Sequence, residues 1–270
     1  MQYDPVKRSL GIVFNKTPFL RKLFYRLLDL LLLRAWYIKK EVKKMYKDNR
    51  FLDLQILDAG SGYGQYCYFL SRFLKKSKIL GLDIKEEQIE DCNNFFKQIN
   101  LSDRVHFEYA DLTKYCKDNT YDLVLSVDVM EHIEEDEKVF ENICKSLKKG
   151  GNLLISTPSD LGGSDTDHED GHSFIDEHVR DGYNMEDIKN KLKKAGFSTV
   201  DAKYSYGKPG SIAWRISMKW PIKMVNISKL FFILLVPYYI IMYPIAFVLD
   251  WIDTITTHKR GTGLIVKATK

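Results

Sequence analysis

The stretch QILDAGSGYGQYCYFL, residues 55–70, restricts the fold of this chain more than any other. An apolar start leads into three alternating glycines, Gly60, Gly62 and Gly64, and a helical pattern of apolar residues follows. This order predicts a strand, a sharp turn and a helix. Because glycine has no Cβ, its backbone can touch a ligand, and the free N–H groups of the next helix point toward the same place. At the end of the first strand of an open α/β sheet, such a turn predicts a nucleotide-binding site.

The strand pattern returns three times, and polar residues follow it each time. The three runs are 79–83, 104–109 and 121–127. Asp83 ends the first run, where a carboxylate can accept hydrogen bonds from both hydroxyls of a ribose. Asp111 and Leu112 follow the second run and offer an acceptor for an adenine amino group and an apolar surface for its face. These positions predict one adenosine-binding edge of a sheet.

At these residues the chain resembles the class I S-adenosylmethionine-dependent methyltransferases that act on small molecules. The matching pieces are DAGSGYG, the acid of GLDI, YADL and DLVLSVDVMEHI, in the order of the family. The resemblance implies S-adenosylmethionine as cofactor and an α/β fold, a seven-stranded Rossmann-like sheet with helices on both faces. It also implies that Asp58 lies near the cationic methionine end of the cofactor. The residues that it implies hold the cofactor are Asp58, Gly60, Gly62, Gly64, Asp83, Ile84, Asp111, Leu112 and Val127.

A dinucleotide-binding domain is the rival interpretation of the glycine turn. Its usual pattern is G-x-G-x-x-G, in which the last glycine stands three residues after the second. Here Gly64 stands two residues after Gly62, and Gln65 and Tyr66 follow. The spacing, together with Asp58 two residues before the first glycine, favours the methyltransferase pattern over a nicotinamide site.

The distribution of charge divides the chain into a core and two basic flanks. Residues 1–50 contain 13 Lys and Arg against 4 Asp and Glu, and residues 208–260 contain 7 against 2, whereas residues 51–207 contain 19 against 30. We therefore assign residues 1–50 to an N-terminal helical arm, 51–207 and 261–270 to the methyltransferase core, and 208–260 to an insertion. Basic flanks on an acidic core suit nucleic acid, an anionic membrane surface or attraction within the molecule.

The arm is predicted to form one basic amphipathic helix from Pro18 to about Lys47. The apolar residues that share a face are Leu20, Leu23, Phe24, Leu27, Leu28, Leu31, Ala35 and Ile38. Relatives of this type often use an N-terminal helix as a lid over the cofactor. The same composition also suits contact with a membrane surface, and one helix could do both.

The insertion contains twenty residues without a charge, LFFILLVPYYIIMYPIAFVL at 230–249. This length matches a membrane span, but a single crossing would separate the last strand, 263–268, from its sheet. We expect Pro237 and Pro244 to interrupt the helix. A bent hairpin in one leaflet, an apolar cap over the active site, and a buried helix or dimer interface all remain open. The basic residues that flank this run favour an anionic lipid surface.

Two histidines are the candidates for acid–base chemistry. His132 follows the fourth strand, on the rim where an acceptor would lie, and we expect it to line the site. His178 belongs to an H-x-R segment that, in the family, borders the acceptor pocket, and it is the preferred candidate. Its loop also contains His168 and His172 among acids, but their spacing matches no zinc pattern, so no metal is predicted.

These features predict methyl transfer to an apolar small molecule, such as a lipid, a quinone precursor or a polyketide, at a membrane surface. The four scattered cysteines indicate a reducing compartment, so we expect a cytoplasmic enzyme, peripheral or monotopic at the membrane. A nucleic-acid substrate is disfavoured, because the N/D-P-P-Y/F segment of amine methyltransferases is replaced by Ser126-Val127-Asp128-Val129. The alternatives are a soluble enzyme acting on a polar metabolite or nucleic acid, and an inactive cofactor-binding scaffold. The oligomeric state is not predicted.

Overall fold

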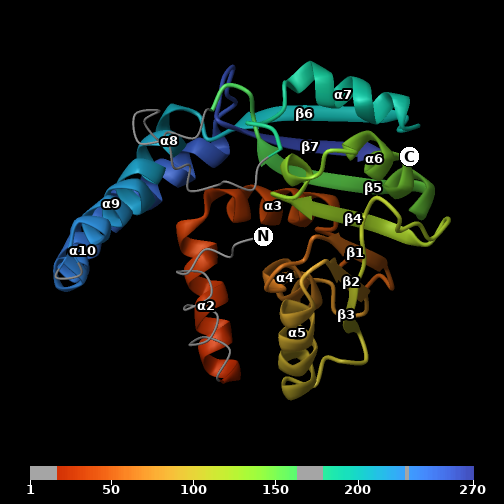
Figure 1. Cartoon of the computed structure of the whole chain (residues 1–270), viewed down its shortest axis with the longest axis horizontal. Helices are drawn as coiled ribbons and strands as arrows, with labels where there is room; N and C mark the ends of the chain where they lie inside the picture. Colours follow the sequence, from red (N-terminus) through yellow and green to blue (C-terminus); the bar gives the residue numbers. More distant parts are fainter. Residues whose placement is uncertain (1–16, 163–178, 229–230) are drawn as a thin grey trace.

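The computed structural model describes residues 17–162, 179–228 and 231–270, and it contains one seven-stranded sheet (Figure 1). The strand order is β3-β2-β1-β4-β5-β7-β6, and β7 alone runs antiparallel to its neighbours β5 and β6. The strands are β1 (Gln55–Ala59), β2 (Lys78–Asp83), β3 (Val105–Tyr109), β4 (Tyr121–Val127), β5 (Leu147–Pro158), β6 (Thr199–Ser205) and β7 (Gly263–Thr269). The predicted fold class is confirmed, and the last strand does return to the sheet.

Helices cover both faces of the sheet, because its central strands are apolar on both sides. One face packs against α3 (Leu33–Met45), α4 (Gln65–Phe73) and α5 (Glu86–Gln98). The other face packs against α6 (Asp136–Ser146) and α7 (Met185–Lys194). Alternate residues of β1 serve the two layers: Ile56 belongs to the first core and Leu57 to the second. Because β1 to β5 pair in parallel, their carboxyl ends meet at one edge of the sheet.

The fifth strand begins directly where the preceding helix ends. The helix before it ends at Ser146, and Leu147 already pairs with Tyr121 of β4. Lys148 then binds Asp122, with Nζ 2.8 Å from Oδ2. The strand therefore includes the Lys-Lys-Gly-Gly segment, residues 148–151, where its register with β4 shifts.

The arm forms two helices, so the prediction of one long helix is wrong. Residues Pro18–Leu31 form α2 and Leu33–Met45 form α3, with Leu32 in an extended conformation between them. In α2, Arg21 and Tyr25 are buried, whereas Leu23 and Leu27 of the apolar face are 38% exposed. No glycine or proline marks the break. The bend allows α2 to pack on the glycine turn while α3 packs on the sheet, which only the tertiary contacts could decide.

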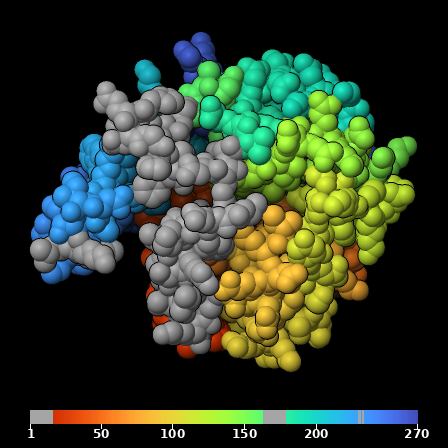
Figure 2. All heavy atoms as spheres, viewed as in Figure 1, coloured from red at the N-terminus to blue at the C-terminus, as the bar shows by residue number. Residues whose placement is uncertain are grey.

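The insertion forms a helical hairpin that projects from the core (Figures 1 and 2). Its first limb contains α8 (Lys208–Trp214), a π-helical turn (Arg215–Lys219) and α9 (Trp220–Ile227), and its second limb is α10 (Phe231–Ile255). Pro237 and Pro244 lie inside α10, so the expectation that they interrupt this helix is wrong. Each proline removes one backbone hydrogen bond, yet α10 is held along its length by contacts such as Tyr238 to Ile216 O.

Buried contacts fasten the base of the hairpin to the arm. The Tyr37 hydroxyl donates to Asp253 Oδ1 over 2.7 Å, and Gly210 N donates to Asp253 Oδ2 over 2.9 Å. Trp36 packs edge-on against Phe247, with ring centroids 4.9 Å apart. The carboxylate of Asp253, which is fully buried, therefore joins α3, α8 and α10 at one point.

Candidate cofactor and acceptor site

The glycine turn lies against the end of β2. The backbone N–H groups of Gly60 and Ser61 both donate to the carbonyl of Leu82, over 2.9 and 2.8 Å. Gly62 N donates to Asp83 Oδ2 over 2.8 Å, so the predicted ribose-binding acid also holds the turn. The glycine turn and the acid that ends β2 are therefore joined directly.

The three glycines of the turn have left-handed backbone angles, with φ of 84°, 49° and 73° at Gly60, Gly62 and Gly64. A Cβ on Gly60 would overlap Val129, and one on Gly64 would come within 3.0 Å of Phe107. A Cβ on Gly62 would meet nothing within 4 Å, so the turn presents bare backbone to open space there. This space is what a ligand held by main-chain groups requires.

The predicted adenosine end contains one exposed apolar residue and two acids. Ile84 is 47% exposed beside Asp83. Asp111 Oδ1 accepts hydrogen bonds from Thr113 N and Oγ1, over 2.9 and 2.7 Å, and these bonds lower the pKa of Asp111. Leu112 is 8% exposed. The contact of Asp111 with an adenine amino group remains a prediction, since its carboxylate already organises its own turn.

Asp58 lies at the other end of the turn and is buried. Its Oδ2 accepts a hydrogen bond from the Cys67 thiol over 3.2 Å. Burial raises the pKa of Asp58 to about 7, since few groups offset the lost hydration of its charge. Such a carboxyl suits a cationic group nearby, and its place beside the methionine end of the cofactor stays a prediction.

The arm contributes a cation that the sequence did not single out. Arg34, at the start of α3, pairs with Asp128 just after β4, with Nη1 2.7 Å from Oδ2. Arg34 N donates to the Tyr206 hydroxyl over 3.1 Å, just beyond the end of β6. The pair lies beside half-buried Val127, the predicted cofactor contact that ends β4. Nothing in the local sequence of Arg34 distinguishes it from the other basic residues of the arm.

Glu131 is a second residue that the sequence reasoning missed. Its side chain is fully buried, and Oε2 accepts a hydrogen bond from Thr157 Oγ1 at the end of β5 over 3.1 Å. Burial and the neighbouring Asp128 raise its pKa well above the usual range of a glutamate. The Glu-His pair after β4 was the available signal, but the hypothesis considered only its histidine.

The structure describes one of the two predicted histidines, His132. His132 is half-buried in the 3-10 turn Met130–His132, where its N–H donates to Val129 O over 3.0 Å. His178, like His168 and His172, lies outside the described residues, so its role remains a prediction. In the same H-x-R segment, Arg180 Nη1 lies 2.6 Å from Asp136 Oδ2, which is a structural ion pair. Among the described residues, no group of three or more His, Cys, Asp or Glu side chains could hold a metal ion.

The arm also reaches the glycine turn. Arg21, buried in α2, donates from Nη2 to the Tyr63 carbonyl over 2.8 Å, and the Tyr25 hydroxyl donates to the same oxygen. The buried Arg21 guanidinium also lies 5.6 Å from the centre of the Tyr25 ring. Because Tyr63 lies between Gly62 and Gly64, α2 is fastened to the turn itself, as a lid helix would be.

The residues present fit an adenosine-bearing sulfonium. The open backbone at Gly62, the acid Asp83 at the end of β2 and the buried acid Asp58 would hold its sugar and its cationic end. A nicotinamide dinucleotide fits less well, because the glycine that its pattern needs is replaced by Gln65, which begins α4.

Comparison with known proteins gives the same result. A family model described as a methyltransferase domain matches residues 52–203. Phosphoethanolamine N-methyltransferase 1 of Triticum aestivum is 32% identical over 170 residues, which are 60% of this chain and 32% of that protein. The ubiquinone biosynthesis O-methyltransferase of Rickettsia bellii is 27% identical over 125 residues, 46% of this chain and 50% of that protein. The matched part is therefore half or less of the length of these relatives.

A solved structure shows the same fold. It is phosphoethanolamine N-methyltransferase 2 of Haemonchus contortus, in complex with phosphomonomethylethanolamine and S-adenosylhomocysteine. It superposes with a TM-score of 0.60 at 20% identity, covering 87% of this chain and 53% of that one. At this identity the likeness shows the fold, and the acceptor of that enzyme says nothing by itself about the acceptor here.

Proposed function

This chain belongs to the class I S-adenosylmethionine-dependent methyltransferases, and we propose that it methylates an apolar small molecule at a membrane surface. When bound, the cofactor supplies an electrophilic methyl carbon. The chain itself aligns the reacting groups and excludes water. The glycine turn and Asp83 would hold the nucleoside, Asp58 would face the cationic end, and the residues around Arg34 and Asp128 would border the acceptor.

The projecting hairpin supports the membrane part of this proposal. Its second limb has one segment, Ile233–Ile255, that is long and apolar enough to cross a bilayer and is mostly exposed. Ile240 is 70% exposed and Ile241 63%. Such a continuous apolar surface is unusual on a soluble monomer and is typical of membrane or protein contact.

Charge points to an anionic lipid surface as the partner. The insertion contains two acids, Asp250 and Asp253, and both are buried at its base. The charged residues along its first limb and its connections are basic: Lys208, Arg215, Lys219, Lys223, Lys229, Lys259 and Arg260. Both limbs join the core at the same end, so the hairpin could dip into one leaflet without separating β7 from the sheet.

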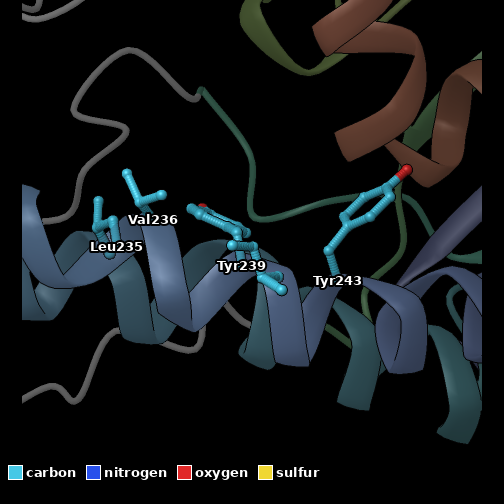
Figure 3. A pocket seen from close by; sticks show the side chains of 5 residues that line it. Leu235, Val236, Tyr239 and Tyr243 are labelled. Carbon is cyan, nitrogen blue, oxygen red and sulfur yellow. The ribbon is translucent and has the colours of Figure 1, made fainter.

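An apolar groove along α10 supports an apolar acceptor. It has a volume of about 430 Å³ and is lined by Leu235, Val236, Tyr239, Ile240 and Tyr243 (Figure 3). Tyr243 points toward the N-terminal helices, and its hydroxyl donates to Leu30 O over 3.4 Å. A hydrocarbon chain could follow this surface from the lipid toward the arm and the acceptor side of the site.

Vesicle flotation tests the membrane part. We expect the protein to float with vesicles of phosphatidylcholine and phosphatidylglycerol at low salt, and much less with phosphatidylcholine alone. The double variant Ile240→Glu, Ile241→Glu should float at least tenfold less, since each substitution places a charge on the exposed face of α10. The matched control is Phe51→Glu, because Phe51 is 64% exposed on the core. Equal flotation of all three proteins would count against the hairpin as the membrane contact.

Turnover tests the chemistry. The enzyme and an isotopically labelled methyl donor are added to a membrane-lipid extract and to a soluble extract. We expect a labelled product in the lipid extract. A product confined to the soluble fraction would favour the alternative of a polar acceptor. Binding of S-adenosylhomocysteine without a labelled product in either fraction would favour an inactive scaffold.

A further inference from the structure

Two buried oxygen atoms near Arg34 have no hydrogen-bond partner among the described residues. They are the hydroxyl of Tyr66, in the first turn of α4, and Oε1 of Glu131, just after β4. Tyr66 is 8% exposed and Glu131 is fully buried. Buried polar groups in proteins are nearly always paired, because an unpaired one loses its hydration without compensation. These two atoms therefore need an explanation that the fold by itself does not provide.

Several polar groups around the two atoms are paired, whereas the buried hydroxyls of Ser61 and Ser126 are, like the two atoms, without a partner among the described residues. Asp128 binds Arg34, Tyr206 accepts from Arg34 N, and Thr157 donates to the second oxygen of Glu131. Burial lowers the pKa of Arg34, but electrostatic interactions, with Asp128 first and with Tyr66 and Glu131 among the weaker ones, raise it overall, so these groups lie within electrostatic range of one guanidinium. Two further facts connect this cluster to the cofactor turn: the charge of Asp58 acts on Tyr66, and Gly60 closely approaches Val129.

We propose that Tyr66 and Glu131 form the polar end of the acceptor site, and that Glu131 takes the proton of an acceptor amine or hydroxyl. This rests on the proposed function. In the balanced step, the acceptor's lone pair forms a bond to the methyl carbon, the carbon–sulfur bond breaks with its electrons left on sulfur, and the acceptor's proton moves to Glu131 Oε1. The Tyr66 hydroxyl orients the nucleophile by a hydrogen bond.

The charges of the cluster select the class of acceptor. Asp58, Asp128 and Glu131 provide three carboxyl groups, and Arg34 provides the cation that is paired with one of them. Arg34 is already paired with Asp128, so a phosphate or carboxylate placed beside the two unpaired oxygens would not meet an unpaired guanidinium. A neutral hydroxyl or an amine would satisfy both unpaired oxygens. The reacting end of the acceptor is therefore an N–H or O–H group.

Calorimetry with two cofactor analogues tests this without knowledge of the acceptor. S-adenosylhomocysteine lacks the methyl group, whereas sinefungin carries an amino group on the atom that replaces the sulfonium centre. We expect the wild type to bind sinefungin more tightly, because its ammonium reaches Glu131. In Glu131→Gln this preference should fall about tenfold or more, the range of a lost charge-assisted bond, while the affinity for S-adenosylhomocysteine changes little. The matched control is Glu134→Gln, because Glu134 is an exposed acid three residues away.

The outcomes separate the two proposals. An unchanged preference for sinefungin in Glu131→Gln would overturn the role of Glu131. Failure of the wild type to bind S-adenosylhomocysteine would instead overturn the proposed function. If Glu131→Gln does not fold, Tyr66→Phe removes one hydroxyl from the same place. The Tyr66→Phe variant must then show a smaller preference for sinefungin over S-adenosylhomocysteine, because the proposal requires both Tyr66 and Glu131 to face the amine.

Discussion

Arg34 and Asp128 lie far apart in the chain and form an ion pair of 2.7 Å at the carboxyl edge of the sheet. Arg34 begins the second helix of the arm, and Asp128 follows β4 with a left-handed φ of 53°. The pair fixes this strained residue beside Glu131 and joins the arm to the candidate acceptor site. The basic arm is therefore part of the site and not an appendage to the core.

Loss of this pair should loosen the arm. Arg34→Ala leaves Asp128 without its partner, but both side chains are about a third exposed, so we expect the free energy of unfolding to fall by only about 1 kcal/mol. Urea unfolding measures this change, and limited proteolysis of the arm should become faster. Arg26→Ala, at an exposed position of α2, is the control and should change neither. Equal proteolysis rates for both variants would show that other contacts hold α3.

A methyl group at Gly62 should remove cofactor binding without unfolding the protein. In Gly62→Ala the new Cβ enters the open space of the turn, and the left-handed backbone costs about 1–2 kcal/mol. The control is Gly150→Ala, since Gly150 has a φ of 78° and equally open surroundings but lies far from the site. Thermal unfolding should shift similarly in both variants, whereas calorimetry with S-adenosylhomocysteine should detect a large loss only in Gly62→Ala. Similar affinities would mean that the ligand does not approach this turn.

Asp83→Ala should weaken cofactor binding by about 1–3 kcal/mol, through the loss of charge-assisted hydrogen bonds. Part of the effect is indirect, because Asp83 also accepts the hydrogen bond of Gly62 N. Titration with S-adenosylhomocysteine measures the change. Asp103→Ala, at an exposed turn position, should bind normally. Wild-type affinity in Asp83→Ala would show that the ribose assignment is wrong.

The buried acid Asp58 should make stability depend on pH. Its folded pKa of about 7 lies above the ordinary value of 3.8, so its contribution is complete below about pH 4 and is lost as pH rises through 7. In Asp58→Asn this loss disappears, so the variant should gain about 3 kcal/mol of stability relative to wild type as pH rises from 5 to 8. Urea unfolding across this range measures the difference.

The control for the pH experiment is Asp53→Asn, because Asp53 is an exposed acid close to β1. Its stability curve should run parallel to that of the wild type. Other buried acids with raised pKa values, Glu131 and Asp250, remain in both proteins and affect both curves alike. A curve for Asp58→Asn that also runs parallel to wild type would mean that Asp58 titrates normally.

Local patterns were sufficient for the core. The strand-turn-helix order around Gly60, Gly62 and Gly64 and the acid at Asp83 predicted a cofactor edge, and the structure joins them by a hydrogen bond. They were predictable because the residues that carry the information are neighbours in the chain, or follow successive parallel strands whose ends meet. The return of the last strand to the sheet was expected for the same reason, whereas the form of the insertion before it was left open between a hairpin, a cap and a buried helix.

Residues brought together from distant segments were not predictable. The arm is apolar enough for one helix, yet its bend at Leu32 depends on packing against both the turn and the sheet. Pro237 and Pro244 stay within α10 because neighbouring helices hold it. Arg34 and Glu131 resemble many other charged residues of the chain, and their importance appears only when burial and partners are known.

The sequence by itself indicated the fold and the cofactor class, because motifs that are contiguous along the chain resemble those of a known family. The cofactor residues that this resemblance implies stay predictions. The tertiary structure decided where the arm bends, which charges are buried and which oxygen atoms lack a partner. These properties depend on desolvation and on contacts between distant segments, and neither can be read from local sequence.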